Sequence, residues 1–269
     1  MDVLSAIILG LMQGVMEFLP ISSSGHLILI KEAIFIDEIN RLAVGGMLFL
    51  STTFAITLYF WNDIWVLIQT LMRKLGRLPV NEKDLVLLYA LLLGSIPALV
   101  LGLFLESIFE KYLNNILVIA IVLLFSSVFL MYAEWHYYQN PHRNTITARK
   151  GWQIGLFQIL ALIPGFSRVG VTMAGGMLLG LSRFESAKFS FLLAIPLALG
   201  LGIKKLLDLI VIEGEIAWVP IMIASAISFV IALIVIHLFL SYIRRHTLWP
   251  FIWYNVILAM LAIYFISFV

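Results

Sequence analysis

The chain has 269 residues, of which 62% are apolar and only 12% are Asp, Glu, Lys or Arg. A soluble globular domain carries about a quarter charged residues, so this composition excludes a soluble protein and indicates an integral membrane protein. The absence of cysteine excludes disulfides and thiol chemistry. The net charge of +2 is too small to indicate nucleic-acid binding, and we expect none.

Apolar segments long enough to cross a membrane follow one another along the chain. A span needs about twenty apolar residues. Six unbroken segments qualify as full transmembrane helices: 43–64, 85–107, 115–134, 187–205, 217–241 and 250–268. Two further apolar segments are broken by proline and glycine. The segment 3–33 is broken between Pro20 and Gly25, and the segment 151–181 is broken between Pro164 and Gly170. No basic leader precedes the first of these, so we expect it to be retained rather than cleaved as a signal peptide.

The broken segments are predicted to be re-entrant helical hairpins. The two arms of 151–181 would be only about 16 to 20 Å long as helix, at about 1.5 Å per residue, which is too short to cross the bilayer. Irregular backbone at membrane depth is tolerated only where protein or a water-filled cavity satisfies its hydrogen bonds. We therefore expect both breaks, in 3–33 and in 151–181, to lie inside the protein.

The distribution of Lys and Arg predicts the orientation of the chain. Eleven of these residues lie in four connections: 65–84, 135–150, 182–188 and 242–249. Five lie in the other three connections: 31–42, 106–114 and 204–216. Because connections rich in Lys and Arg stay in the cytoplasm, the first set should be cytoplasmic. The first hairpin then enters from outside and the second from inside, and three spans follow each.

This topology describes a single membrane domain, 1–269, built as an inverted repeat of 1–145 and 146–269. The sequence supports it, because Gly-Leu-x-Gln recurs at Gly10 and Gly155, and a further glycine follows 15 residues after each. Inverted repeats with broken helices commonly place a polar site near the midplane, between the two halves. The polar residues of the two broken segments should therefore form one site.

The first polar cluster contains a carboxylate in an apolar setting. Gln13 and Glu17 are four residues apart and therefore share a helix face. Glu17 could coordinate a divalent cation, since Mg²⁺ is often bound by one or two carboxylates together with substrate phosphates. The structural alternative is a solvated or protonated, hydrogen-bonded Glu17.

Three serines and a histidine follow in the same cluster. Ser22, Ser23 and Ser24 come after Pro20 and resemble the capped start of a helix, which is a site for anions. His26 could act as a nucleophile, a general acid or base, or a donor to phosphate, because its usual pKa is near neutrality. The alternatives are capping alone for the serines and a bond to a backbone carbonyl for the histidine.

The second cluster places a guanidinium at another helix start. Gly165, Ser167 and Arg168 form the turn, and Thr172 lies four residues on, above Arg168. Guanidinium binds phosphate oxygens in a bidentate manner and stays charged, and the helix dipole also favours an anion there. The structural alternative is a buried ion pair between Arg168 and Glu17. By contrast, Glu134 adjoins a basic connection and is expected to be solvated or to face lipid headgroups.

Together the clusters suit a phosphate or diphosphate attached to a lipid. Hydrolysis of a phosphoanhydride mainly requires positioning and charge neutralisation. Binding alone needs the same groups, so these residue types leave an enzyme and a carrier of the anion both open.

The two clusters resemble the motifs of the undecaprenyl-diphosphate phosphatase family, also called the bacitracin-resistance family. Gln13 to Glu17 fit its first motif, and Phe18 to His26 fit the continuation Phe-Leu-Pro-x-Ser-Ser-x-Gly-His. The second motif, Pro-Gly-x-Ser-Arg-Ser-x-x-Thr, matches from Pro164 to Thr172 except at Val169. Val169 removes a hydroxyl, and Phe166 places a ring where a small polar residue is usual, so the chain resembles a divergent member.

The resemblance implies a multi-pass enzyme of the plasma (inner) membrane that removes the terminal phosphate of a C55 polyprenyl diphosphate for cell-wall polysaccharide synthesis, with Mg²⁺ or Ca²⁺ as cofactor. It implies a metal or diphosphate role for Glu17, phosphoryl transfer at His26, Ser22 and Ser23, and phosphate binding by the second cluster. His26, a serine and activated water stay open as nucleophile. The alternative function is a transporter or flippase of polyprenyl phosphate, and self-association into a homodimer is left open.

Overall fold

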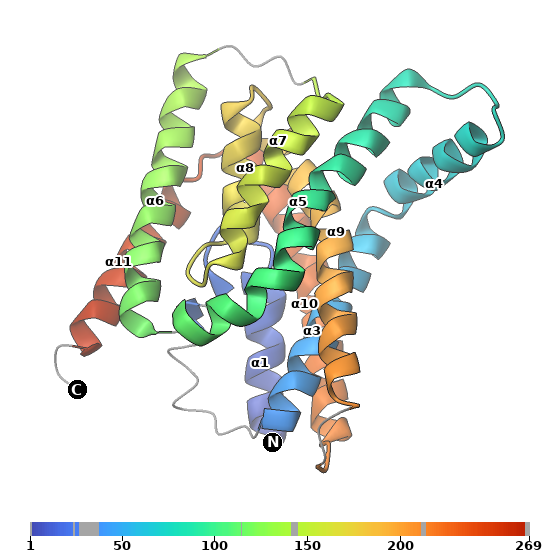
Figure 1. Ribbon diagram of the computed structural model, residues 1–269. Coiled ribbons are helices and arrows are strands. Elements are labelled where there is room, and N and C mark those ends of the chain that lie inside the picture. The colour runs from blue at the N-terminus through green and yellow to red at the C-terminus, as the bar shows by residue number, and fades with distance from the viewer. Residues whose placement is uncertain are drawn as a thin grey trace.

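The computed structural model describes residues 2–23, 25–26, 38–113, 115–140, 145–210 and 214–266, and every regular element in these ranges is a helix (Figure 1). The first half contains α1 (Val3–Met16), α3 (Glu38–Tyr59), α4 (Trp61–Leu75), α5 (Glu82–Leu113) and α6 (Ile116–Gln139). The second half contains α7 (Ala148–Gln158), the 3-10 turn η1 (Ile159–Leu162), α8 (Arg168–Leu178), α9 (Arg183–Asp208), α10 (Trp218–Ile243) and α11 (Trp249–Ile266).

Five of these helices contain stretches long and apolar enough to cross a membrane: Ile39–Tyr59, Glu82–Gly102, Ile116–Gln139, Arg183–Asp208 and Trp218–Ile243. They correspond to the first five predicted spans, so the protein is an all-α, multi-pass membrane protein. The sixth predicted span, 250–268, forms α11. Its described apolar stretch, Trp249–Tyr264, is shorter than the other five, and 267–269 lie outside the described residues.

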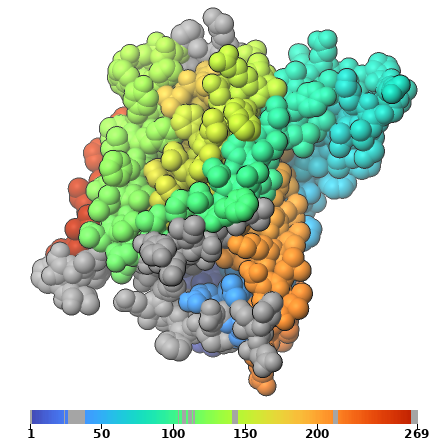
Figure 2. Space-filling model, viewed as in Figure 1, coloured from blue at the N-terminus to red at the C-terminus, as the bar shows by residue number. Residues whose placement is uncertain are grey.

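The structure corrects the predicted boundary of the first span. The prediction placed a span at 43–64 and a connection at 65–84, but α3 ends at Tyr59 and a new helix begins at Trp61. In Figures 1 and 2, α4 projects from the bundle together with the first turns of α5. The break falls at Phe60, where neither proline nor glycine marks it. Apolar composition alone therefore extended the span past its end.

Helix α4 has the side-chain pattern of a helix that lies at a membrane surface. Leu67 is buried against the bundle, whereas Trp61 and Trp65 are exposed and stack on one another. Arg73 and Lys74 occupy its last turn. Tryptophan and basic side chains favour the interface between lipid and water, and this pattern fits a helix that lies along that interface.

Glycines bring two pairs of helices into backbone contact. A side-chain carbon at Gly10 of α1 would overlap the carbonyl oxygen of Ala224 in α10. One at Gly155 of α7 would likewise overlap the carbonyl oxygen of Gly94 in α5. Small residues are what allow such close approach between membrane helices. Both copies of the recurring Gly-Leu-x-Gln pattern therefore begin with a glycine that packs against a neighbouring helix.

The chain breaks at Pro20 and at Pro164 form two turns that carry the polar clusters, and these polar turns are surrounded by an aromatic and aliphatic core. Helices α3 and α9 pack together, as do α6 and α11, and α8 packs between α6 and α9. Phe18, in the first polar cluster, meets Phe191 of α9 edge to face, with ring centroids 5.6 Å apart. The turn between η1 and α8 lies against the start of α6, where Gly165 touches Val122. Both turns are thus held inside the bundle.

Candidate active site

The buried end of α1 holds a carboxylate between two donors. Glu17 caps the C-terminal end of the helix, and the residue is only 8% exposed. Gln13 Nε2 donates to Glu17 Oε2 at 3.1 Å, as the four-residue spacing predicts. Arg168, at the start of α8, donates from Nη2 to Glu17 Oε1. The structure therefore brings Gln13, Glu17 and Arg168 together from the two predicted clusters.

The ion pair leaves the guanidinium with further donor capacity. Arg168 also donates from Nη1 to the carbonyl oxygen of Ala194 in α9, at 3.4 Å. A guanidinium has five N–H donors, and two contacts with the described protein do not use them all. A buried charge without its partner is strongly unfavourable, so Glu17 holds Arg168 in place while part of the guanidinium can meet an anion.

The second turn is tied to the first by a serine hydroxyl. Ser167 is the N-cap of α8, and its Oγ accepts from Gly170 N at 3.2 Å. The same hydroxyl donates to the carbonyl oxygen of Leu19 at 3.1 Å. Gly165 has a φ of +107°, a backbone conformation that favours glycine. Thr172 donates to the carbonyl oxygen of Arg168 at 2.7 Å, so its hydroxyl proton is used within α8.

The imidazole of the first cluster is held by two hydrogen bonds. His26 is 7% exposed; its Nδ1 lies 2.7 Å from the carbonyl oxygen of Ser22, and its Nε2 lies 2.5 Å from the hydroxyl of Tyr254. Ser22 Oγ accepts from Gly25 N at 3.1 Å, which is a capping contact. Ser23 is half-buried, and Ser24 lies outside the described residues. Capping and carbonyl bonding are therefore present, as the structural alternatives predicted.

The two turns and α11 meet at Pro20. Asn255 Nδ2 donates to the carbonyl oxygen of Pro20 at 2.9 Å. A side-chain carbon at Gly170 would stand 3.6 Å from the Pro20 ring, an ordinary contact. The first turn is therefore enclosed by α8 on one side and α11 on the other. His26 faces Tyr254, whereas Arg168 faces Glu17, so the site has two polar centres joined by this turn.

Two residues of α11 that contact the first turn were not predicted from the sequence. Asn255 is fully buried and is the one amide in the predicted span 250–268; such an isolated polar residue is a usable signal. Tyr254 gave no signal, because tyrosine is common near the ends of membrane helices. Its contact with His26 crosses almost the whole sequence.

A second polar cluster lies at the other end of α6, and it corrects an expectation. Glu134 was expected to be solvated, but it is fully buried. It accepts from Arg183 Nε at 2.9 Å and from Leu248 N at 2.6 Å. The carboxylate thus joins the ends of α6 and α9 to the connection before α11. A burial of this kind is decided by tertiary contacts, which the basic composition of the neighbouring connections does not reveal.

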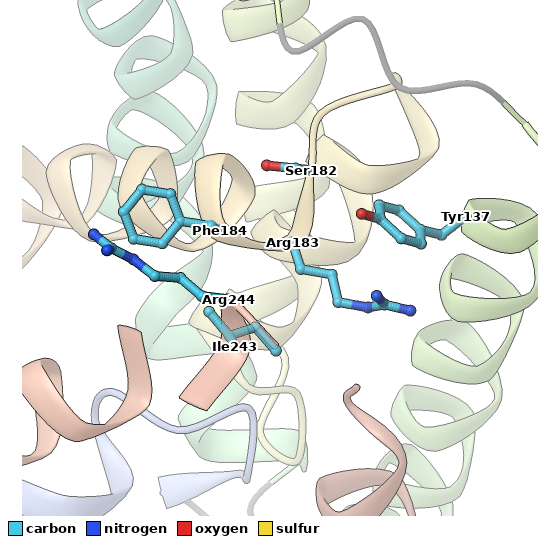
Figure 3. Close-up of a pocket in the computed structure, with 6 residues that line it drawn as sticks. All are labelled: Tyr137, Ser182, Arg183, Phe184, Ile243 and Arg244. Carbon is cyan, nitrogen blue, oxygen red and sulfur yellow. The ribbon is translucent and has the colours of Figure 1, made fainter. Parts of the chain in front are cut away.

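A cavity of about 260 Å³ adjoins this cluster, lined by Tyr137, Ser182, Arg183, Phe184, Ile243 and Arg244. Figure 3 shows the side chains of Arg183 and Arg244 extending in opposite directions. Arg183 lies under the ring of Tyr137 at 4.0 Å, and Arg244 lies over Phe184 at 4.3 Å. The two guanidinium groups do not converge on one ligand, so the polar turns are the better candidate for the active site.

The fold and these turns define a multi-pass helical membrane protein with a buried ion pair, Glu17 with Arg168, between its two polar turns. The chain belongs to the bacitracin resistance protein BacA family, whose model matches residues 6–261. It is 36% identical over 267 residues to an undecaprenyl-diphosphatase of Alteromonas mediterranea, covering 99% of each chain. An undecaprenyl-diphosphatase of Fusobacterium nucleatum is 36% identical, and the match covers 96% of this chain and 98% of the relative. An undecaprenyl-diphosphatase of Trichlorobacter lovleyi is 38% identical, and the match covers 95% of this chain and 94% of the relative. The predicted family is confirmed.

Proposed function

We propose that the protein hydrolyses undecaprenyl diphosphate at the cell membrane to the monophosphate and inorganic phosphate. This reaction recycles the lipid carrier of cell-wall polysaccharide synthesis. The observation that carries the proposal is the Glu17–Arg168 pair, which places a partly free guanidinium inside an apolar bundle. The relatives named above are all diphosphatases, and none supports the alternative of a polyprenyl phosphate transporter or flippase.

We further propose six spans and two re-entrant hairpins arranged as an inverted repeat of 1–145 and 146–269. The helix contacts support it, because exchanging the two halves maps several of the largest helix pairings onto one another. α1 packs on α10 as α7 packs on α5, and α3 packs on α10 as α9 packs on α5. The pairs α3 with α9 and α6 with α11 each map onto themselves. The matching glycines, Gly10 and Gly155, lie at the contacts of the first two pairs.

A divalent cation, Mg²⁺ or Ca²⁺, fits this site as an ion shared with the substrate. In the described part of the chain no group of three His, Cys, Asp or Glu side chains could hold a metal by itself. Each oxygen of Glu17 accepts one hydrogen bond and has two lone pairs, so one remains for a cation. Mg²⁺ is commonly bound by one or two carboxylates and substrate phosphates. When bound, the cation would neutralise charge on the phosphate oxygens.

The residues divide into two groups in this proposal. Those placed at the reacting phosphate are His26, Glu17, Ser23 and Arg168. Those placed around the rest of the diphosphate are Gln13, Ser22, Ser24, Gly165, Ser167 and Thr172. The main task of Arg168 is to bind the phosphate oxygens as negative charge shifts during cleavage of the phosphoanhydride. The hydroxyls of Ser167 and Thr172 chiefly shape the turn, since their protons are bonded to carbonyl oxygens.

The test is release of inorganic phosphate from C55 diphosphate by the purified protein in detergent. We expect release to need Mg²⁺ or Ca²⁺, to stop with a chelator and to resume when the cation is restored. Glu17→Gln should raise the cation concentration needed for half-maximal rate. The variant Arg149→Ala, which changes an exposed arginine of α7, is the control and should keep the wild-type rate.

Lipid binding without phosphate release under any cation would overturn the phosphatase and favour the carrier. Release that persists in chelator would overturn only the role of the cation. A homodimer stays a prediction, and light scattering of the same preparation tests it.

A further inference from the structure

We propose that Tyr254 is a positioning residue for His26, and that its hydroxyl holds the neutral imidazole in one orientation with the ring proton on Nδ1. The inference rests on the proposed part of His26 in phosphoryl transfer. It concerns a residue from the last helix, about 230 positions away along the chain, at 2.5 Å from the ring nitrogen.

The hydrogen bonds of His26 fix the tautomer of its neutral ring. The carbonyl oxygen of Ser22 carries no proton, so His26 Nδ1 must donate in the 2.7 Å contact between them. A neutral imidazole has one N–H, which leaves Nε2 as an acceptor. The hydroxyl of Tyr254 is therefore the donor in the second contact. In this tautomer the Nε2 lone pair accepts the Tyr254 hydroxyl proton, so this contact must open before Nε2 can act as a nucleophile or a general base.

The geometry also fixes the orientation of the ring. The imidazole and the Tyr254 ring are stacked, with centroids 5.5 Å apart and planes 11° from parallel. Two hydrogen bonds at opposite ring nitrogens prevent the imidazole from flipping. A hydrogen-bond partner that sets the tautomer and orientation of a histidine is a common feature of catalytic sites.

The position of Tyr254 is itself held. The next residue, Asn255, donates to the carbonyl oxygen of Pro20 in the turn that precedes His26. Helix α11 thus contacts both the backbone of this turn and the side chain at its end. Tyr254 is 43% exposed, so filling the core does not account for its hydroxyl contact. Replacing it by phenylalanine keeps the ring and removes only the donor.

The experiment compares Tyr254→Phe with Tyr264→Phe, the same change ten residues further along α11 and about 15 Å away. We expect Tyr254→Phe to lower kcat about tenfold, which corresponds to about 1.4 kcal/mol, with KM within about twofold of wild type. Tyr264→Phe should leave both unchanged. Equal kcat in Tyr254→Phe and wild type would overturn the proposal.

A measurement without turnover separates this inference from the function on which it rests. In protein labelled with ¹⁵N-histidine, the His26 signals are identified by their loss in His26→Ala. They should show a protonated Nδ1 and a hydrogen-bonded Nε2. In Tyr254→Phe the Nε2 signal should move toward that of an unbonded nitrogen. An unmoved signal refutes the contact, whereas a moved signal in a protein whose His26→Ala variant keeps full activity refutes only the role of His26.

Discussion

The two polar turns follow the same four-residue pattern, Gly-Leu-x-Gln, but the side chains after this pattern are chemically different. In both, the leading glycine packs against the backbone of a neighbouring helix. Gln13 then donates to Glu17, four residues on. Gln158 is fully buried, and neither atom of its amide has a partner in the described part of the chain; Leu162 stands where Glu17 would be. The packing glycines are therefore the same in the two segments, whereas the polar residues that follow them differ.

The difference follows from the cost of burying charge. If both turns carried a glutamate, two like charges would lie inside the bundle with Arg168 as the cation available to both. Instead the first turn supplies Glu17 and the second supplies Arg168, at the position that corresponds to Ser23. One ion pair therefore needs both halves of the chain. The comparison predicts that polar changes will have unequal effects in the two turns, and glycine changes equal ones.

The largest effect should come from breaking the pair between the turns. Arg168→Ala removes the proposed phosphate ligand and leaves Glu17 buried without its guanidinium partner. We expect phosphate release to fall by about 10³-fold and unfolding to become easier by about 3 kcal/mol. Adding Glu17→Gln to this variant should restore much of the stability but no activity. Activity in Arg168→Ala near that of wild type would show that the pair is only structural.

The second-largest effect should be a loss of stability that is the same in both halves of the chain. Alanine at Gly10 or at Gly155 would push apart two helices whose backbones touch, and overpacking of this kind costs about 1 to 3 kcal/mol. Thermal unfolding in detergent measures it. Gly102→Ala is the matched control, because a side-chain carbon there makes only an ordinary contact, 3.5 Å from Leu162. A loss in only one of the two variants would contradict the proposed repeat.

The smallest effects should differ in kind between the two turns, with a loss of activity in the first and a gain of stability in the second. Gln13→Leu takes a donor from Glu17, and we expect phosphate release to fall by about tenfold. Gln158→Leu replaces an amide that has no partner in the described part of the chain, so stability should rise by about 1 kcal/mol, with unchanged activity. The two variants are compared by phosphate release and by thermal unfolding. Lower stability of Gln158→Leu would mean that its amide is satisfied, for example by buried water.

Parts of this site were predictable because they depend on short spacings. The contact of Gln13 with Glu17 follows from a four-residue step on a helix, and Ser167 caps α8 at the predicted turn. The break after Tyr59 was not predictable from apolar composition, since no residue there forbids a helix. The burial of Glu134 was missed because its partner Arg183 is 49 residues away.

The sequence by itself determined that the chain is a multi-pass helical membrane protein, which residues bear charge within it, and to which family it belongs. These properties depend on composition and on local order, both of which can be read along the chain. Only the tertiary structure decided that Arg168 meets Glu17 while His26 meets Tyr254. Each of these contacts joins residues from opposite halves of the chain, and such contacts are set by how the helices pack in three dimensions.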